Sequence, residues 1–348
     1  MNNVKHILFL VPGFPKDEDD FNCIPPLQDF LIKFHQYYSE VEISVIPFQY
    51  PYHKKNYTWN NINIFPRAGK NSKVKKPLIW LDALYTAQRI HKLKTVDAIH
   101  SLWLGECAMI GNILSKKFDS LHICTLMGQD VKKSNRYLRI LRNRNIKLIA
   151  LSKNQAEQFF NLSKRYVEEI IHWGIDDKQL SNSERNIDLL AVGSLIPLKN
   201  YSLFVNIVAE AAKTYPKIKT ALVGEGPELS KLKKMAREMG IEAHIEFKGL
   251  LNRKDIFKLM QRSKIFVHPS LFEGSGYVFA EALANGMNIV SFNVGYAQKN
   301  PKWSIVNNEE EFSTTTKKLL SEKLDFYPVN LFPISETINS YALLYGII

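Results

Sequence analysis

Short apolar runs alternate with segments of helical period along the whole chain. In the first half, apolar runs predict strands at 5–11, 42–47, 98–101, 123–126 and 147–151. Amphipathic segments between them predict helices at 26–36, 78–91, 106–116 and 154–161. Nearly continuous apolar strands separated by amphipathic helices are typical of a parallel sheet that helices cover on both faces.

A polar segment at 176–186 interrupts this alternation, and we interpret it as a linker. The second half then predicts strands at 188–192, 220–223, 244–247, 264–267 and 288–291. It predicts helices at 201–215, 227–239, 253–261 and 277–285. We therefore predict an α/β protein with two Rossmann-like, doubly wound domains, residues 1–177 and 178–332. Residues 333–348 predict a C-terminal helix with an apolar stripe, and we expect it to return to the N-terminal domain.

The composition is that of a soluble globular protein, with 45% hydrophobic and 23% charged residues. The apolar run near the N-terminus is followed by Pro12-Gly13 and an acidic loop, so we interpret it as a buried strand and not as a secretion signal. Three cysteines, Cys23, Cys107 and Cys124, are scattered without the spacing of metal ligands. A sparse, odd set of this kind favours a cytoplasmic location with buried thiols.

The net charge of +12 is concentrated in residues 51–150, where 19 Lys or Arg face five Asp or Glu, a local net charge of +14. Such a surplus would attract nucleic acid, an anionic membrane surface or an anionic acceptor, although a solvated basic face is also consistent with it. Six basic residues are the candidates for membrane contact: Lys132, Lys133, Arg136, Arg139, Arg142 and Arg144. We expect no nucleic-acid partner, because no recognition module accompanies the charge.

The segment from His268 to Glu281 holds the densest cluster of candidate functional residues. It follows a predicted strand and opens a predicted helix, and glycines at such a turn let a ligand approach the backbone. The helix start would offer N–H groups to a diphosphate. Glu273 in the turn and Glu281 in the helix could each accept hydrogen bonds from a pair of vicinal hydroxyls. One carboxylate would then hold a sugar ring and the other a ribose. A capped surface helix is the alternative interpretation.

This segment resembles the E-x₇-E signature of glycosyltransferase family 4, within the group 1 glycosyltransferases. Other segments are similar to family motifs in the same order, namely 192–200, 222–227 and 247–249, and more loosely 99–103, 125–130 and 170–176. The resemblance implies the GT-B fold, in which two Rossmann-like domains face each other across a cleft. It also implies transfer of a sugar from a nucleotide-sugar donor with retention of configuration. An NAD-dependent oxidoreductase is disfavoured, because the loop after the first strand lacks G-x-G-x-x-G.

The resemblance assigns roles to particular residues. Glu273 and Lys199 are the expected catalytic residues, Glu273 on the donor sugar and Lys199 on the diphosphate. Glu281 would bind the ribose. The remaining expected donor-binding residues are Gly274, Ser275, Gly276, Tyr277, Val278, Gly193, Ser194 and Gly13. We expect no cofactor and no metal, because Lys199 and the helix start would stabilise the leaving diphosphate; the acidic loop Asp17–Asp20 is interpreted as solvated.

Three positions depart from the family pattern. Ser194 stands where the family usually has Arg, and Met127 stands where it usually has a His that a thioether cannot replace as a donor. His172-Trp173-Gly174 replaces the usual P-N-G. We therefore consider two functions. The first is an active glycosyltransferase of polysaccharide or glycolipid synthesis, peripheral at the inner face of a membrane, with a glycan or lipid-linked acceptor. The second is a non-catalytic GT-B protein that binds nucleotide sugar as a scaffold or regulatory subunit.

Overall fold

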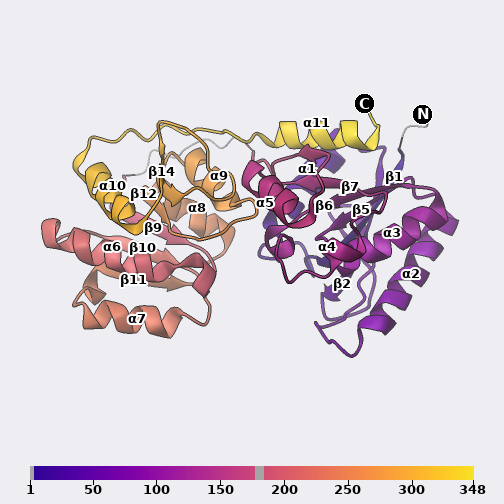
Figure 1. Cartoon of the computed structure of the whole chain (residues 1–348), viewed down its shortest axis with the longest axis horizontal. Helices are drawn as coiled ribbons and strands as arrows, with labels where there is room; N and C mark the ends of the chain where they lie inside the picture. The colour runs from indigo at the N-terminus through magenta and orange to yellow at the C-terminus, as the bar shows by residue number, and fades with distance from the viewer. Residues whose placement is uncertain (1–3, 177–183) are drawn as a thin grey trace. The chain divides into compact units, whose positions relative to one another are not determined.

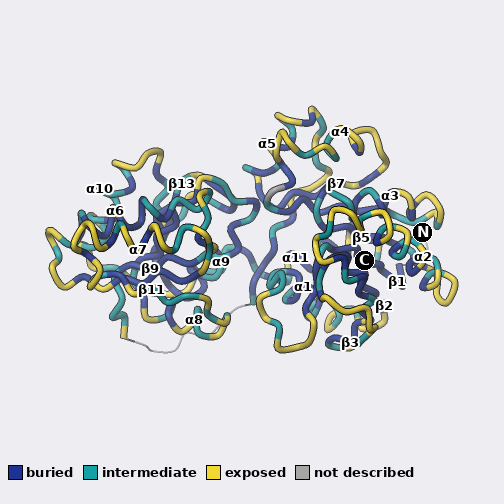
Figure 2. Tube along the Cα trace, turned by 90° about the horizontal axis from the view of Figure 1, so that it is seen from below, coloured by how far each residue is buried: buried dark blue, intermediate teal, exposed yellow. Residues whose placement is uncertain are grey.

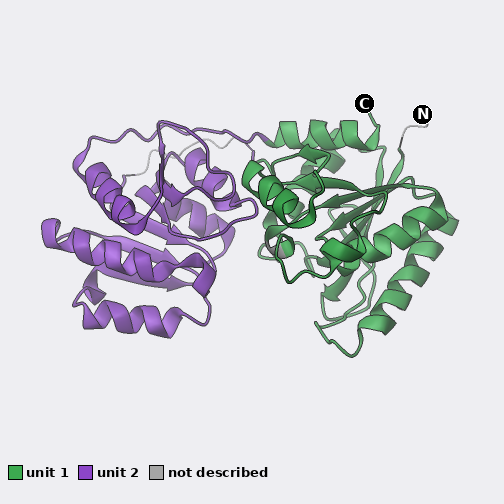
Figure 3. Cartoon of the chain, in the orientation of Figure 1, with its two compact units in different colours: residues 1–174, 334–348 green, residues 175–333 purple. Residues whose placement is uncertain are grey.

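The computed structural model describes residues 4–176 and 184–348 (Figure 1). The chain divides into two compact units, one of residues 1–174 with 334–348 and the other of residues 175–333 (Figure 3). The predicted domain boundary at 177/178 and most of the predicted linker lie outside the described residues. The chain passes between the units twice, at Gly174–Ile175 and at Pro333–Ile334.

The described part of the first unit contains an eight-stranded sheet in the order β3-β4-β2-β1-β5-β6-β7-β8. Its central strands are β2 (Glu42–Tyr50), β1 (His6–Gly13), β5 (Ala98–Leu102), β6 (Leu121–Thr125) and β7 (Lys147–Ala150), all parallel. The edges are the hairpin β3 (Tyr57–Trp59) and β4 (Ile62–Ile64), and the short β8 (Glu169–Ile170). Figure 2 shows the central strands as buried, in keeping with their apolar sequences.

Helices cover both faces of this sheet. Alternation along β1 turns Leu8 and Leu10 toward α2 (Lys76–Leu93) and α3 (Glu106–Phe118), and Phe9 toward Phe30 of α1 (Pro25–Tyr37). The short α4 (Tyr137–Ile140) and α5 (Lys153–Ser163) pack near β7, and the 3₁₀ turn η1 (Gly128–Asp130) follows β6. The resulting order of strand and helix is that of a doubly wound domain.

The last helix, α11 (Ile334–Tyr345), belongs to the first unit and packs against α1. The hydroxyl of Tyr341 lies 2.7 Å from Oγ1 of Thr125, and that of Tyr345 lies 2.5 Å from Nδ1 of His100. His100 Nε2 lies 2.8 Å from the same Thr125 oxygen. Burial lowers the pKa of His100 to about 3, so this histidine is neutral and α11 is attached by a neutral, buried hydrogen-bond network.

The second unit has a six-stranded parallel sheet within its described residues, in the order β11-β10-β9-β12-β13-β14. The strands are β9 (Ile187–Val192), β10 (Thr220–Val223), β11 (Ile245–Gly249), β12 (Ser263–His268), β13 (Asn288–Phe292) and β14 (Trp303–Val306). One face packs on α6 (Tyr201–Thr214), α7 (Leu229–Glu238) and α10 (Glu309–Ser321). The other face packs on α8 (Arg253–Gln261) and α9 (Tyr277–Ala284), and the 3₁₀ turns η2 (Pro197–Lys199) and η3 (Glu242–His244) complete the unit.

The predicted α/β class is confirmed, and every predicted strand and helix is present with ends shifted by three residues or fewer. Among the described residues, six helices and strands were not predicted as regular structure: β3, β4, α4, β8, β14 and α10. Across the described ranges 4–176 and 184–348, no helix combines the length and apolar character needed to cross a bilayer.

Two loops of the second unit touch backbone to backbone. Gly224 after β10 has φ +139°, and a Cβ there would lie 1.9 Å from the carbonyl oxygen of Gly193 after β9. An L side chain at Gly224 would therefore meet both a forbidden backbone conformation and a clash with backbone. The glycine lets these two strand-to-helix loops meet at the carboxyl edge of the sheet.

Candidate functional site

The candidate site is formed by the loops at the carboxyl ends of three neighbouring strands, β10, β9 and β12. Because these strands are parallel, the loops that follow them open on the same edge of the sheet, the edge at which doubly wound sheets bind ligands. The loop from Gly193 to Lys199 and the loop from His268 to Gly276 are held together by a hydrogen bond from the Leu271 amide to the Leu198 carbonyl oxygen, 3.0 Å long.

Glu273 lies between β12 and α9, and two side chains donate hydrogen bonds to its carboxylate. Its Oε1 accepts hydrogen bonds from Lys199 Nζ and from His268 Nε2, the latter at 2.6 Å. Only 11% of the Glu273 side chain is exposed. The structure thus brings together the two residues predicted to be catalytic, and Lys199 is paired with the Glu273 carboxylate.

The ionisation of Glu273 is set by two opposing effects. Burial raises the pKa of Glu273, but the hydrogen bond from His268 and the charge of Lys199 outweigh this and lower the pKa to about 2. Burial also lowers the pKa of His268, against the opposing effect of Glu273. The site therefore holds an ionised carboxylate at neutral pH, which can accept hydrogen bonds from hydroxyls.

Glu281 is the fifth residue of α9, about one turn from its start, and faces α8. Its Oε1 is 2.8 Å from Nε of Arg253, and the Arg253 guanidinium also lies 3.3 Å from the hydroxyl of Tyr277 and over its ring. Arg253 was not predicted as a site residue, because it precedes Glu281 by 28 positions and only the packing of α8 on the β12–α9 side brings them together. The predicted ribose-binding acid is thus already paired with a cation.

The predicted diphosphate seat, residues 274–278, forms the start of α9. Gly276 is the N-cap residue in the left-handed region, with φ +71°. The amide of Tyr296, after β13, donates to the Ser275 carbonyl oxygen at 2.8 Å, and this bond fixes the loop between β12 and α9. A helix start carries partial positive charge and N–H groups that the helix itself does not use, so this segment has the polarity that an anion requires.

The other predicted donor-binding residues divide between the units. Gly193 and Ser194 follow β9 in the second unit, and the Ser194 side chain is exposed. A Cβ at Gly193 would lie 2.5 Å from the hydroxyl of Tyr201, so this glycine leaves room for a buried tyrosine. Gly13 ends β1 and lies buried in the first unit, whereas the other predicted donor-binding residues belong to the second unit. The structure therefore groups every predicted donor-binding residue except Gly13 within the second unit.

Met127, which stands where the family usually has His, lies just after β6 in the first unit and is buried. Asp130 lies in the loosely similar segment 125–130 and was not predicted as a site residue, yet its Oδ2 accepts the amide hydrogens of Met127 at 2.6 Å and Leu104 at 2.9 Å. Burial raises the pKa of Asp130 to about 7. This carboxyl ties together the loops that follow β5 and β6, which the sequence pattern alone could not show.

No group of three or more His, Cys, Asp or Glu side chains is placed to hold a metal ion within residues 4–176 and 184–348. In the acidic loop, Asp20 accepts hydrogen bonds from the Tyr50 hydroxyl, at 2.7 Å, and from the Lys16 amide, at 3.2 Å.

Comparison with known proteins finds a family match over most of the second unit. The family model described as "Glycosyl transferases group 1" matches residues 174–323. An uncharacterized glycosyltransferase of Methanocaldococcus jannaschii is 24% identical over 224 residues, which are 62% of this chain and 61% of the relative. The Bacillus subtilis glycosyltransferase YqgM is 31% identical over 109 residues, 31% of this chain and 30% of YqgM. The chain thus spans less than two thirds of the length of either relative.

Solved structures match over nearly the whole chain. The Anabaena protein HepE in complex with UDP-glucose superposes with a TM-score of 0.71 at 18% identity, covering 99% of this chain and 100% of HepE. The pneumococcal O-GlcNAc transferase GtfA, in complex with UDP and GlcNAc, has a TM-score of 0.68 at 10% identity, covering 99% of each chain. At these identities the likeness concerns the fold, and the predicted GT-B fold is confirmed.

Proposed function

We propose, proceeding from the group 1 glycosyltransferase family to which residues 174–323 belong, that this chain transfers a sugar from a nucleotide-sugar donor to a glycan or lipid-linked acceptor. Retention of configuration and membership of family 4 are part of the proposal. The observation that carries it is the site at the carboxyl edge of the second sheet, where ionised Glu273, Lys199 and the start of α9 adjoin. A role in polysaccharide or glycolipid synthesis follows from the acceptor class.

The proposed mechanism assigns each of these groups a task. The start of α9 and Lys199 would stabilise the negative charge that develops on the leaving diphosphate, a compensation supplied by fixed dipoles and a cation. Glu273 would hold hydroxyls of the donor sugar while the sugar–phosphate bond loosens, and Glu281 would hold the ribose. The acceptor hydroxyl would then attack from the face that the diphosphate leaves. With these groups in place, neither a cofactor nor a metal is needed.

Ser194 stands where the family usually has an arginine, so one cation is absent there. Arg253 would replace part of that positive charge. Its guanidinium lies beside Tyr277 at the start of α9, on the side of the site that Glu281 faces. A second cation near the start of α9 would add positive charge where the donor's diphosphate is proposed to bind.

Binding and turnover can be tested separately with UDP, UDP-glucose and UDP-N-acetylglucosamine. At a free ligand concentration about 100 times Kd, a donor should stabilise the native protein by roughly 2.7 kcal/mol. For a unit of this size the melting temperature should rise by roughly 5–10 °C. Release of UDP from either sugar nucleotide measures turnover. The absence of any thermal shift with the three ligands, and with the corresponding GDP, ADP and dTDP compounds, would refute the proposal.

The alternative is a GT-B protein that binds nucleotide sugar without turnover. It rests on Met127 and Ser194, two of the three positions that depart from the family pattern. It predicts a thermal shift with a donor but no release of free nucleotide, with or without added acceptors. Turnover that depends on Glu273 would exclude this alternative.

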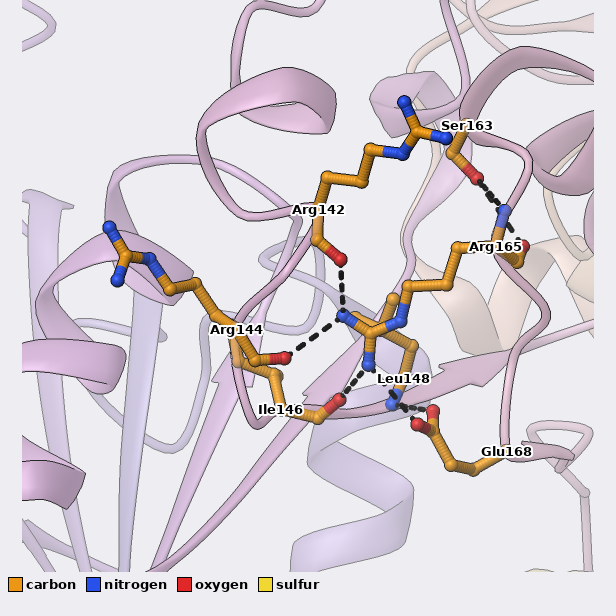
Figure 4. A network of polar contacts seen from close by, with 7 residues as sticks. All are labelled: Arg142, Arg144, Ile146, Leu148, Ser163, Arg165 and Glu168. Carbon is orange, nitrogen blue, oxygen red and sulfur yellow. Dashed lines mark hydrogen bonds and ion pairs between the residues drawn. The ribbon is translucent and has the colours of Figure 1, made fainter.

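We also propose that the protein is cytoplasmic and peripheral at an anionic membrane surface, which the basic residues of 51–150 would contact. Arg165 holds the segment between α4 and β7 by donating to the carbonyl oxygens of Arg142, at 3.2 Å, and Arg144, at 3.1 Å. Figure 4 shows that the guanidinium group of Arg144 points away from this cluster, while the side chain of Arg142 extends toward Ser163; both arginines are exposed. Their charge is therefore available to an anionic surface.

A second feature of the first unit supports contact with lipid. The outer stripe of α2 exposes Leu78, Leu81 and Tyr85, which follow one another at helical spacing. Residues 70–94, which include this stripe, contain seven Lys or Arg and one acid, Asp82. Exposed apolar side chains flanked by cations are typical of helices that lie on anionic bilayers.

We expect replacement of the three stripe residues, as L78S/L81S/Y85S, to weaken binding to phosphatidylglycerol-containing vesicles. Each deleted side chain removes up to roughly 1.5–3 kcal/mol of apolar burial, so the triple change should lower the partition coefficient at least tenfold. Co-sedimentation with vesicles at low salt measures it. Leu250→Ser, an equally exposed leucine of the second unit, is the control and should bind like the wild type. Equal sedimentation with purely zwitterionic vesicles, or none with anionic ones, would count against the membrane proposal.

A further inference from the structure

His268 is the last residue of β12 and is completely buried behind the donor site. Its ring packs between Phe266, at a centroid distance of 5.6 Å, and Phe279 of α9, at 4.9 Å. A polar ring in such an apolar setting must satisfy its hydrogen-bonding groups or lose free energy. Its Nε2 lies 2.6 Å from Oε1 of Glu273.

The geometry defines which nitrogen of His268 carries the proton. Because Nε2 faces an ionised carboxylate, it must be a donor, whereas Nδ1 is buried and has no hydrogen-bond partner among the described residues. A proton on Nδ1 would be a buried donor without an acceptor, which is costly. The ring is therefore neutral, with its single proton on Nε2 directed at Glu273.

The two donors share one oxygen of the carboxylate. Both His268, at the end of β12, and Lys199, in η2, donate to Oε1 of Glu273. No residue in the described parts of the chain donates to Oε2. One oxygen is thus used to fix the carboxylate, and the other is left for a ligand.

We propose that His268 is a positioning residue for the glycosyl-transfer site: it holds Glu273 so that Oε2 is presented to the hydroxyls of the donor sugar. This inference rests on the proposed function. Lys199 supplies charge but sits on a flexible stem and would also be drawn to the diphosphate. When the diphosphate binds Lys199, the rigid imidazole is the group that keeps Glu273 in place.

The test compares His268→Phe, which keeps a ring but removes the donor, with His268→Gln, which restores an N–H donor. His268→Phe loses a hydrogen bond to a charged group. This loss should lower kcat/KM with UDP-glucose or UDP-N-acetylglucosamine about tenfold to 100-fold. His268→Gln should recover most of this. UDP lacks the donor sugar that Glu273 would hold. Its Kd should therefore stay within about threefold of the wild type, because diphosphate binding uses other groups.

The pH profile separates positioning from a merely structural role. The groups that titrate around the pair are Lys199 and Tyr201, besides Glu273 and His268 themselves. Glu273 has a lowered pKa, so its ionised form is lost only as the pH falls toward 2; removing the His268 donor raises that pKa. The acid limb of activity should therefore move to higher pH in His268→Phe but not in His268→Gln. Phe279→Leu, which loosens the packing and keeps the donor, should lower the melting temperature without moving the limb.

A measurement without substrate keeps this inference distinct from the proposed function. In a double-mutant cycle of His268→Phe and Glu273→Gln, the coupling in urea denaturation should be present above about pH 4.5 and shrink as the pH falls toward 2. A wild-type enzyme that is inactive with every donor would defeat the function and leave this coupling intact. An unmoved acid limb, a His268→Gln variant as impaired as His268→Phe, or no coupling would overturn the positioning role.

Discussion

Glu273→Gln should lower kcat/KM for transfer from the preferred sugar nucleotide by about 100-fold to 1,000-fold, the loss expected when a preorganised electrostatic contact is removed. The amide is isosteric and can still accept a hydrogen bond from His268, but it carries no charge. If the amide is rotated by half a turn, its NH₂ group and not its oxygen faces Lys199 and His268, the two donors that share Oε1 of Glu273. UDP release measured with and without acceptor is the assay.

The control for this experiment is Glu238→Gln on α7, a glutamate of the same unit whose side chain is 61% exposed. It should leave kcat/KM unchanged, because an exposed i,i+4 pair contributes little. The Kd of UDP in Glu273→Gln should stay near the wild-type value if the carboxylate contacts the sugar alone. A variant that keeps full activity would remove Glu273 from the site, and a wild type that binds donor without turnover would establish the non-catalytic alternative.

The largest effect on stability should come from Gly224→Ala. Its Cβ would lie 1.9 Å from the Gly193 carbonyl oxygen, and its φ of +139° is unfavourable for any L residue. Backbone strain and overpacking together should cost about 3–5 kcal/mol. In a unit of this size that corresponds to a fall in melting temperature of roughly 10 °C, measurable by calorimetry.

Gly240→Ala is the matched control for Gly224→Ala. Gly240 also has a positive φ, of +68°, but a Cβ there meets nothing within 4 Å. Its substitution should cost only about 1 kcal/mol, the price of the left-handed conformation. If the two variants melted alike, the close approach of the β9 and β10 loops would not be a determinant of stability. Since Gly193 borders the donor site, Gly224→Ala should also weaken UDP binding.

The hydrophobic periodicity predicted the central strands and helices because each is buried on a sheet face or along one stripe. It missed the hairpin of β3 and β4, although Trp59-Asn60-Asn61-Ile62 contained a usable signal. Both asparagines have positive φ, 46° and 63°, as a two-residue hairpin turn requires. It also missed α10, whose first turn is three glutamates capped by Asn308. Capping residues, rather than apolar spacing, mark that helix.

For the candidate site, family motifs located Glu273, Glu281 and Lys199, and the structure places Lys199 against Glu273. Their partners could not be predicted in the same way. Arg253 reaches Glu281 only through the packing of α8, and His268 was visible next to the motif but its direction depends on the pleat of β12. Contacts between separate elements depend on tertiary packing, which a periodic pattern does not encode.

The attachment of α11 also has a consequence for the order in which the protein folds during synthesis. The first unit lacks the helix that covers Phe30 and Trp173 until residues 334–348 have been made, after the whole of the second unit. At about 5–20 residues per second, the roughly 160 intervening residues take about 8–30 s to translate. During that interval the nascent first unit would expose an aromatic surface to chaperones, while the second unit can already fold. A ribosome that stopped before α11 would therefore release a chain whose unfinished part is its beginning.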